Sequence, residues 1–193
     1  MFGLGNKKIG SIHLGNTKIA KAYLGDKLVF DGTKSTMPDM NVGNIINWAG
    51  YEWIVVNDNE DGTVVLAMKD VYLLTAFNTN GYAAYSGSTI ATRAKTLEDS
   101  LDSDLISQAV DVTVSGVTSK VFVPTYTQVF NRFSYFQNDN SRIAYFNGVA
   151  KEWWLSSNYN SVYIDMVWTT GKRSWDQPGY THGFRPFVTL KKS

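Results

Sequence analysis

Two short stretches near the C-terminus decide the fold. They read EWWLSS at residues 152–157 and GFRPFV at residues 183–188. The first predicts a buried strand, because three successive residues are large and apolar: Trp153, Trp154 and Leu155. The second predicts the last strand, which continues to Leu190. Arg185 interrupts it, where an inward guanidinium can hold neighbouring loops together.

Further strands are predicted upstream of these stretches. Residues 45–56 predict two strands around a glycine turn, and residues 63–68 predict their returning partner. Residues 112–123 predict a hairpin closed by the pair Ser115-Gly116.

The polar segment between the second and third of these strands resembles the front half of a calcium-binding loop. It carries Asn57, Asn59, Asp61 and Gly62, but Met68 stands where a bidentate glutamate is required. A hairpin loop is therefore the favoured interpretation.

Helices are predicted at three places. Residues 88–101 carry apolar side chains at helical spacing, and residues 102–110 continue this helix or form a second short one. Another begins at Pro124, because Thr125 and Gln128 have the spacing of a capping box. The acidic pairs Glu98-Asp99 and Asp102-Asp104 are interpreted as a solvated helix face rather than catalytic carboxylates. The predicted class is α+β, mostly antiparallel strands with two or three helices.

The N-terminus contains a repeat with a ten-residue period. It reads LGNKKI at 4–9, LGNTKI at 14–19 and LGDKLV at 24–29. Each Gly-Asn or Gly-Asp pair predicts a two-residue hairpin turn, and the stretches between them predict strands of a small meander. We expect residues 1–34 to serve attachment or oligomerisation, the alternative being a flexible leader. A linker at 35–40 then precedes a larger domain at 41–193.

Composition excludes several classes of function. The 193 residues include 18 Lys+Arg and 17 Asp+Glu, so a net charge of +1 does not favour nucleic acid as a partner. The chain has no Cys, which removes disulfides, thiolate metal sites and thiol nucleophiles, and its two His leave little for histidine-based catalysis. The apolar runs are too short for membrane insertion, and we expect no signal peptide.

The predicted ligand-binding surface lies between the two C-terminal motifs. This segment combines large rings with polar side chains that form directional hydrogen bonds, a combination that suits a sugar or a protein epitope. The candidate residues are Asn158, Tyr159, Asn160, Tyr163, Asp165, Trp168, Arg173, Trp175, Asp176, Tyr180 and His182. The alternative is that Tyr163 and Trp168 point inward from a strand at 162–168, and that Trp175 or Tyr180 only closes the fold.

Neither a cofactor nor a catalytic residue is predicted. Asp165 and Asp176 can join Asn158 or Asn160 in a calcium site, but their spacing does not require one. A glycosidase needs two carboxylates across a cleft, and Glu152 is the only attractive acid. We therefore expect a protein that is not an enzyme.

Two resemblances extend this reading. The N-terminal repeat resembles a hairpin motif of minor tail and baseplate proteins from phages that infect Gram-positive bacteria. Residues 45–190 resemble an uncharacterised domain family of bacterial and phage surface proteins with Trp-Trp-Leu-Arg-Ser and Gly-Val-Arg-Pro motifs. Its motif residues are matched here by Trp153, Trp154, Gly183, Arg185 and Pro186. Ser156 departs from the pattern, because it stands where the family has an arginine that would carry an internal salt link.

The Gly-Phe-Arg ending is also similar to that of C-type-lectin-like folds, including the formylglycine-generating-enzyme branch and the variable proteins of diversity-generating retroelements. The resemblances imply a virion tail or baseplate receptor-binding protein that adheres to a host surface glycan or protein. Residues 1–34 would contact other tail proteins and form a homo-oligomer such as a trimer. The alternatives are a structural tail accessory protein and, less favoured, a cell-wall polysaccharide hydrolase.

Overall fold

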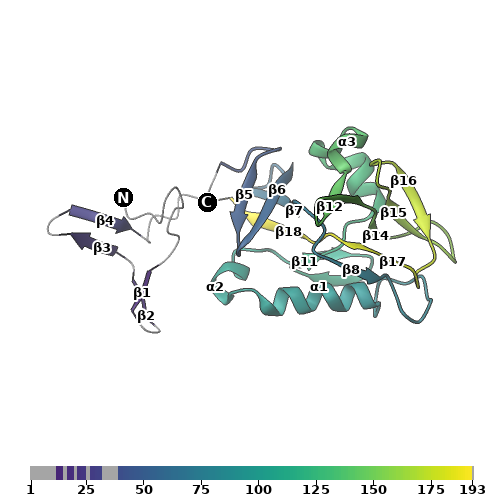
Figure 1. Cartoon of the computed structure of the whole chain (residues 1–193), viewed down its shortest axis with the longest axis horizontal. Helices are drawn as coiled ribbons and strands as arrows, with labels where there is room; N and C mark the ends of the chain where they lie inside the picture. Colours follow the sequence, from purple (N-terminus) through teal and green to yellow (C-terminus); the bar gives the residue numbers. More distant parts are fainter. Residues whose placement is uncertain (1–11, 15–16, 20, 25–26, 32–38, 193) are drawn as a thin grey trace. The chain divides into compact units, whose positions relative to one another are not determined.

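The computed structural model describes residues 12–14, 17–19, 21–24, 27–31 and 39–192. The chain divides into two compact units, Met1–Pro38 and Asp39–Ser193. Each unit is described by itself below, with the elements labelled as in Figure 1.

The described part of the first unit consists of two antiparallel hairpins. β1 (Ile12–Leu14) pairs with β2 (Thr17–Ile19), and β3 (Lys21–Leu24) pairs with β4 (Lys27–Asp31). They form two separate two-stranded sheets, so the expected single meander is not found among the described strands. The first repeat at 4–9, the three predicted turns and most of the predicted linker lie outside the described residues.

The second unit contains two five-stranded sheets. The first has the order β11-β18-β7-β6-β5 and is entirely antiparallel. Its strands are β5 (Ile45–Trp48), β6 (Tyr51–Asp58), β7 (Thr63–Met68), β11 (Val121–Phe122) and β18 (Phe187–Lys191). The segment 59–62 joins β6 to β7, which confirms the predicted hairpin loop.

The second sheet carries the predicted ligand-binding segment. Its order is β16-β15-β14-β17-β8, and β14 pairs in parallel with β17 through Trp153 and Gly183. The strands are β8 (Leu73–Ala76), β14 (Trp153–Asn158), β15 (Ile164–Val167), β16 (Arg173–Asp176) and β17 (Thr181–Phe184). The predicted strand at 162–168 is therefore shorter than expected.

The predicted hairpin at 112–123 is partly wrong. β9 (Val112–Val114) pairs with β10 (Val117–Ser119) around Ser115 and Gly116, which both have positive φ, as a primed turn requires. β11, in contrast, leaves this hairpin and pairs with β18, because its buried residues join the core there. A further hairpin joins β12 (Ala144–Phe146) to β13 (Val149–Lys151).

The first predicted helix forms within the expected range, and the predicted capping box is present. α1 (Thr89–Ser100) begins after Ser88, whose side chain accepts from the amide of Ala91, and α2 (Ser103–Ile106) is separate and short. Thr125 and Gln128 form the predicted capping box: the amide of Thr125 donates to Gln128 Oε1 at 2.8 Å, and the amide of Gln128 donates to Thr125 Oγ1 at 3.2 Å.

The segment after the capping box is wound more widely than the predicted helix. Residues 128–132 form the π-helical turn η1 (Gln128–Arg132), because the amide of Phe133 donates to the carbonyl of Gln128, five residues back. A 3-10 turn, η2 (Ser134–Phe136), and the short helix α3 (Asp139–Arg142) follow.

One predicted feature of α1 is wrong. Glu98 is not on a solvated face: its side chain is 12% exposed and accepts from the amides of Lys120 and Val121 beside β11. Its neighbour Asp99 remains solvent-facing, with 62% of its side chain exposed. The helix spacing therefore identified the apolar face but not the strand contact at its end.

Two hydrophobic cores lie on opposite faces of the strands. Neighbouring residues of β6 belong to different cores: Trp53 and Val55 pack with Ile90 and Leu97 of α1, whereas Ile54 and Val56 pack with the segment 129–136. α1 covers one face and the region from η1 to α3 covers the other (Figure 1). This double burial explains the continuous apolar run of β14, because neither of its faces meets water.

None of the helices in the described part of the chain has the length and apolar character needed to cross a bilayer.

Candidate ligand-binding surface and a separate groove

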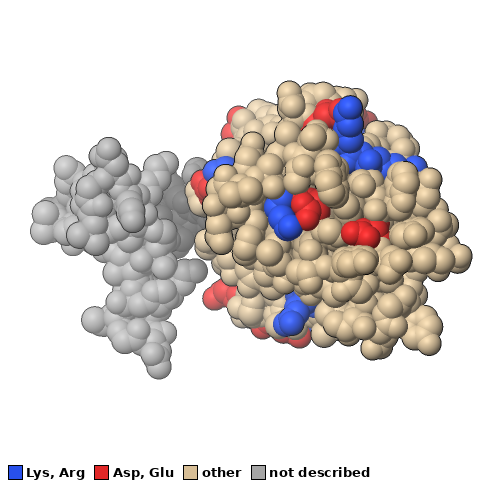
Figure 2. Space-filling model, turned by 45° about the vertical axis from the view of Figure 1, so that its right-hand side comes forward, with Lys and Arg blue, Asp and Glu red and all other residues tan. Residues whose placement is uncertain are grey.

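The predicted ligand-binding residues occupy the β14–β15 loop, the β15–β16 hairpin and the approach to β17. Most of them are exposed: Asn158, Tyr159, Asn160, Trp168, Arg173, Trp175 and Tyr180. Tyr163 and Asp176 are half-buried, while Asp165 and His182 are buried at 1% and 8% exposure. Figure 2 shows a face of this unit on which charged side chains are sparse.

The rings of Tyr159 and Trp175 stack directly on one another. Their centroids are 4.2 Å apart and their planes differ by 8°. Tyr159 is nevertheless 41% exposed and Trp175 45% exposed. Stacking holds both rings in a fixed orientation, so the pair offers a rigid aromatic surface to a ligand.

Arg173 extends this pair into a longer stack. Its guanidinium carbon lies 5.1 Å from the ring centre of Tyr159 and 3.9 Å from that of Tyr126. Tyr126 stacks on Phe130 at 4.9 Å, and the guanidinium of Arg142 lies 4.4 Å from the ring of Phe130. We call this series the stacked ladder; its members are Trp175, Tyr159, Arg173, Tyr126, Phe130 and Arg142.

Asp165 anchors the ladder from below. Nε and Nη2 of Arg173 each approach Asp165 Oδ1 at 2.8 Å, and the Ser157 hydroxyl donates to Asp165 Oδ2 at 3.1 Å. The Ser157 hydroxyl oxygen in turn accepts from the amide of Tyr126 at 2.8 Å. Asp165 therefore lies buried beneath the exposed surface, where its contacts orient Arg173.

His182 also supports the surface from inside the protein. Its Nδ1 lies 3.0 Å from Glu152 Oε1 and its Nε2 lies 2.9 Å from Asp176 Oδ2, while its ring packs edge-on against Trp154. His182 is therefore a buried member of the predicted surface, with a carboxylate beside each of its ring nitrogens.

Glu152, the acid considered for hydrolysis, takes part in this internal network. It contacts Lys151 Nζ at 2.6 Å and keeps 13% of its side chain exposed. Burial opposes ionisation, but hydrogen bonds from Lys151 and His182 outweigh it and hold the pKa of Glu152 below its usual value. The carboxylate is therefore an ionised partner in a polar network.

The considered calcium site is not assembled from the predicted residues. Asp165 and Asp176 lie on opposite faces, because Asp165 is in register with Trp175, the neighbour of Asp176. Each carboxylate is already engaged, by Arg173 and by His182 respectively. Within residues 39–192 and the described N-terminal strands, no group of three or more metal-ligating side chains is found.

Arg185 of the second motif is a fully buried structural residue. It donates to the carbonyls of Met68, Lys69 and Arg142, and its guanidinium lies 5.1 Å from the ring centre of Trp153. Burial lowers its pKa to about 10. The carbonyl of the next residue, Pro186, accepts from the amide of Met68, so the motif fastens the end of β7.

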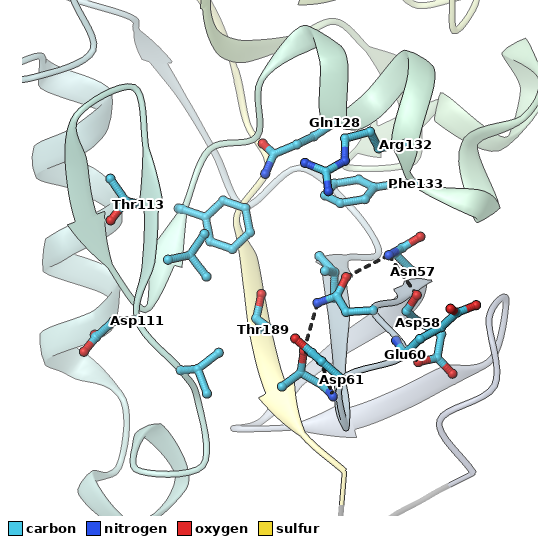
Figure 3. Close-up of a pocket in the computed structure, with 16 residues that line it drawn as sticks. Asn57, Asp58, Glu60, Asp61, Asp111, Thr113, Gln128, Arg132, Phe133 and Thr189 are labelled. Carbon is cyan, nitrogen blue, oxygen red and sulfur yellow. Dashed lines mark hydrogen bonds between the residues drawn. The ribbon is translucent and has the colours of Figure 1, made fainter.

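A groove of about 920 Å³ lies apart from the stacked ladder and was not predicted. It opens between the β6–β7 loop, β9, η1 and β18 (Figure 3). Its floor contains Val65, Phe122 and Phe133, and its walls are polar. No residue lines both the groove and the ladder, although η1 contributes to each.

Sequence reasoning also missed half of the ladder. Tyr126, Phe130 and Arg142 lie far from residues 158–182 in the chain, and none of them was among the predicted binding residues. The cue available was the capping box at Thr125, which predicts where this segment turns but not which side chains meet Arg173.

Comparison with known proteins identifies one domain family. A family model described as a domain of unknown function, DUF6273, matches residues 91–192. No curated protein and no solved structure matches the chain. The matched segment begins inside α1 and contains every residue of the stacked ladder.

Proposed function

The chain belongs to the DUF6273 domain family, and we propose that it is a receptor-binding protein of a phage tail or baseplate. In this proposal the second unit is a C-type-lectin-like head that binds a host surface glycan without catalysis. The N-terminal repeat attaches the head to other tail proteins and joins several copies. The alternative, a structural tail protein that contacts only its virion neighbours, is an outcome of the tests below.

The observation that carries the proposal is the exposed pair of Tyr159 and Trp175 with Arg173 held beside it. Sugars present apolar faces that stack on aromatic rings and hydroxyls that accept hydrogen bonds from a guanidinium. Because Asp165 and Ser157 already orient Arg173, little side-chain freedom is lost when a ligand binds. A rigid surface of this kind suits recognition without chemistry.

Repetition of the head would strengthen weak binding. A single shallow aromatic surface gives modest affinity, whereas several linked copies bind a repetitive glycan through avidity. The proposed oligomer of the N-terminal repeat supplies such copies, and this fits an attachment protein better than an isolated receptor domain.

Host-cell binding by ring-truncated variants tests the proposal. We expect Trp175→Ala to reduce binding of the full chain to host cells and glycan arrays at least about tenfold, because an anchoring aromatic contributes more than ~1.4 kcal/mol. Trp168→Ala and Tyr180→Ala test the outer limits of the surface. Tyr82→Ala is the matched control, since Tyr82 is 73% exposed but lies outside the ladder.

The outcomes separate the candidate functions. Unchanged host binding in all three test variants would reject the adhesin proposal. Binding to purified tail proteins without any binding to cells would favour the structural alternative.

A further inference from the structure

The groove shown in Figure 3 is the open end of the second hydrophobic core. Thr189 lies at its centre, on the face of β18 that also carries Phe187. Thr189 is 5% exposed, and its hydroxyl has no hydrogen-bond partner among the described residues. Thr189 Oγ1 is not one of the fully enclosed polar atoms that lack a partner, so it is accessible from the groove and can form a hydrogen bond with a ligand.

One side of the groove presents hydrogen-bond donors. Gln128 and Arg132 extend from η1 toward the groove (Figure 3). The side-chain oxygen of Gln128 is used by Thr125, which leaves its NH₂ group for a ligand. The Arg132 guanidinium forms no ion pair with any described residue. Together they match a carboxylate.

The other walls are acidic. Glu60 and Asp61 come from the β6–β7 loop and Asp111 from the segment before β9 (Figure 3). Within the described chain none of the three is paired with a Lys or Arg, in contrast to Asp58, which is bound by Lys192. Asp61 accepts hydrogen bonds from the amide and the hydroxyl of Thr63, and these neutral donors leave the charge of the Asp61 carboxylate uncompensated. These walls therefore favour a cationic group.

We infer that the groove binds a short peptide that carries both a free carboxylate and a primary amine. The carboxylate lies against Arg132 and Gln128, and the amine of a lysine side chain lies against Glu60 and Asp61 on the β6–β7 loop. The aliphatic stem of the lysine covers the apolar floor of the groove, and a peptide group pairs with Thr189. A volume of about 920 Å³ accommodates a few residues.

This inference is independent of the proposed function. The ladder and the groove share no residue, and a peptide site is compatible with an adhesin and with a structural tail protein alike. Its chemistry also differs, because the groove offers separated opposite charges and the ladder offers aromatic faces.

Calorimetric titration of the full chain tests the inference with three probes. The first is N-acetyl-Ala-Lys-Ala with a free C-terminal carboxylate, the second is its C-terminal amide, and the third replaces Lys by Ala. We expect the first to bind at least about tenfold more tightly than either of the others, because each of these lacks one charge-assisted contact.

Four variants identify the groups involved. Arg132→Gln should weaken the affinity for the free acid to that for the amide and leave the affinity for the amide unchanged. Glu60→Gln should weaken the affinity for both lysine probes. Thr189→Val, which keeps the side-chain shape, should weaken all three probes while preserving the unfolding midpoint. Arg93→Gln is the matched control, because Arg93 is exposed on α1 outside the groove.

Three results would overturn the inference. The first is the absence of peptide binding at millimolar concentration by the folded chain. The second is that Arg132→Gln lowers the affinity for the free acid and the affinity for the amide by the same factor. The third is a glycan-array signal lost in Thr189→Val but kept in Trp175→Ala, which would assign the groove to a sugar. Trp175→Ala should leave peptide binding unchanged, because Trp175 belongs to the ladder and not to the groove. Peptide binding and host-cell binding can therefore fail independently of one another.

Discussion

At the scale of single residues, Asp165 decides what Arg173 can do. The carboxylate is buried and binds both Nε and Nη2 of the guanidinium. These bonds hold the guanidinium plane between Tyr126 and Tyr159. Without them, the Arg173 side chain would be free to adopt several orientations. The orientation of the exposed Arg173 therefore depends on a buried residue beneath it.

We predict that Arg173→Lys weakens ligand binding even though it keeps the positive charge. An ammonium group lacks the planar fork that bonds Asp165 while stacking on Tyr126. Asp165→Asn should weaken binding by a similar factor, because the guanidinium loses its charged partner. Affinity measured together with the thermal midpoint checks this, and Lys172→Gln serves as an exposed neighbouring control. Full affinity in Arg173→Lys would refute the positioning role.

Ser156 and Ser157 are neighbours with opposite expected effects. Ser156 Oγ is buried with no hydrogen-bond partner, while Ser157 Oγ bonds both Asp165 and the amide of Tyr126. We predict that Ser156→Ala leaves the free energy of unfolding unchanged or raises it by about 1 kcal/mol, and that Ser157→Ala lowers it by about 1–3 kcal/mol. Urea denaturation measures both, and a larger loss in Ser156→Ala would contradict the reasoning.

At the scale of elements, Glu98 joins the end of α1 to the start of β11. It accepts from the amides of Lys120 at 2.8 Å and Val121 at 3.1 Å and pairs with Lys95. Burial opposes its ionisation, but these contacts outweigh burial and hold its pKa below the ordinary value of 4.5. The contact ties the helix that covers one core to an edge of the first sheet.

The lowered pKa predicts the direction of a pH effect. A carboxylate with a lower pKa in the folded state stabilises the protein above pH 4.5, and this contribution is lost as the pH falls below 4.5 through the folded-state value. We expect Glu98→Gln to reduce the free energy of unfolding by about 1–3 kcal/mol at pH 7 and to flatten its decline below pH 4.5. Asp99→Asn, an exposed control on the same turn, should change the pH profile little. Parallel profiles for wild type and Glu98→Gln would disprove the assignment.

At the scale of the whole molecule, the second unit contains both hydrophobic cores. Among the residues whose burial the structure describes, every core residue lies at position 40 or beyond. We predict that residues 39–193, expressed alone, keep the thermal midpoint of the second unit, because they retain all of the described core residues. If the repeat joins several copies as proposed, we expect the full chain to be oligomeric and the shortened chain to be monomeric.

Light scattering after size-exclusion chromatography distinguishes the two contributions. A monomer in both forms would remove the oligomerisation role while leaving the fold prediction intact. A lower midpoint in the shortened chain would show that the first unit stabilises the second.

The sequence by itself determined the local elements of this protein. The position of α1, the capping box at Thr125 and the β6–β7 hairpin all follow from it. Their signals are local, since helix and strand periods and capping hydrogen bonds involve residues a few positions apart. The burial of Trp153 and Trp154 follows in the same way from an uninterrupted apolar run.

Only the tertiary structure decided which side chains meet. The partners of Arg173, the burial of Asp165 and the strand contact of Glu98 each join segments distant in the chain. A strand pattern shows that neighbouring residues face opposite ways, but packing of the region from η1 to α3 decides which face is covered. The groove around Thr189 exists for the same reason: the second core is closed at one end and open at the other, a property of assembled layers that no single segment encodes.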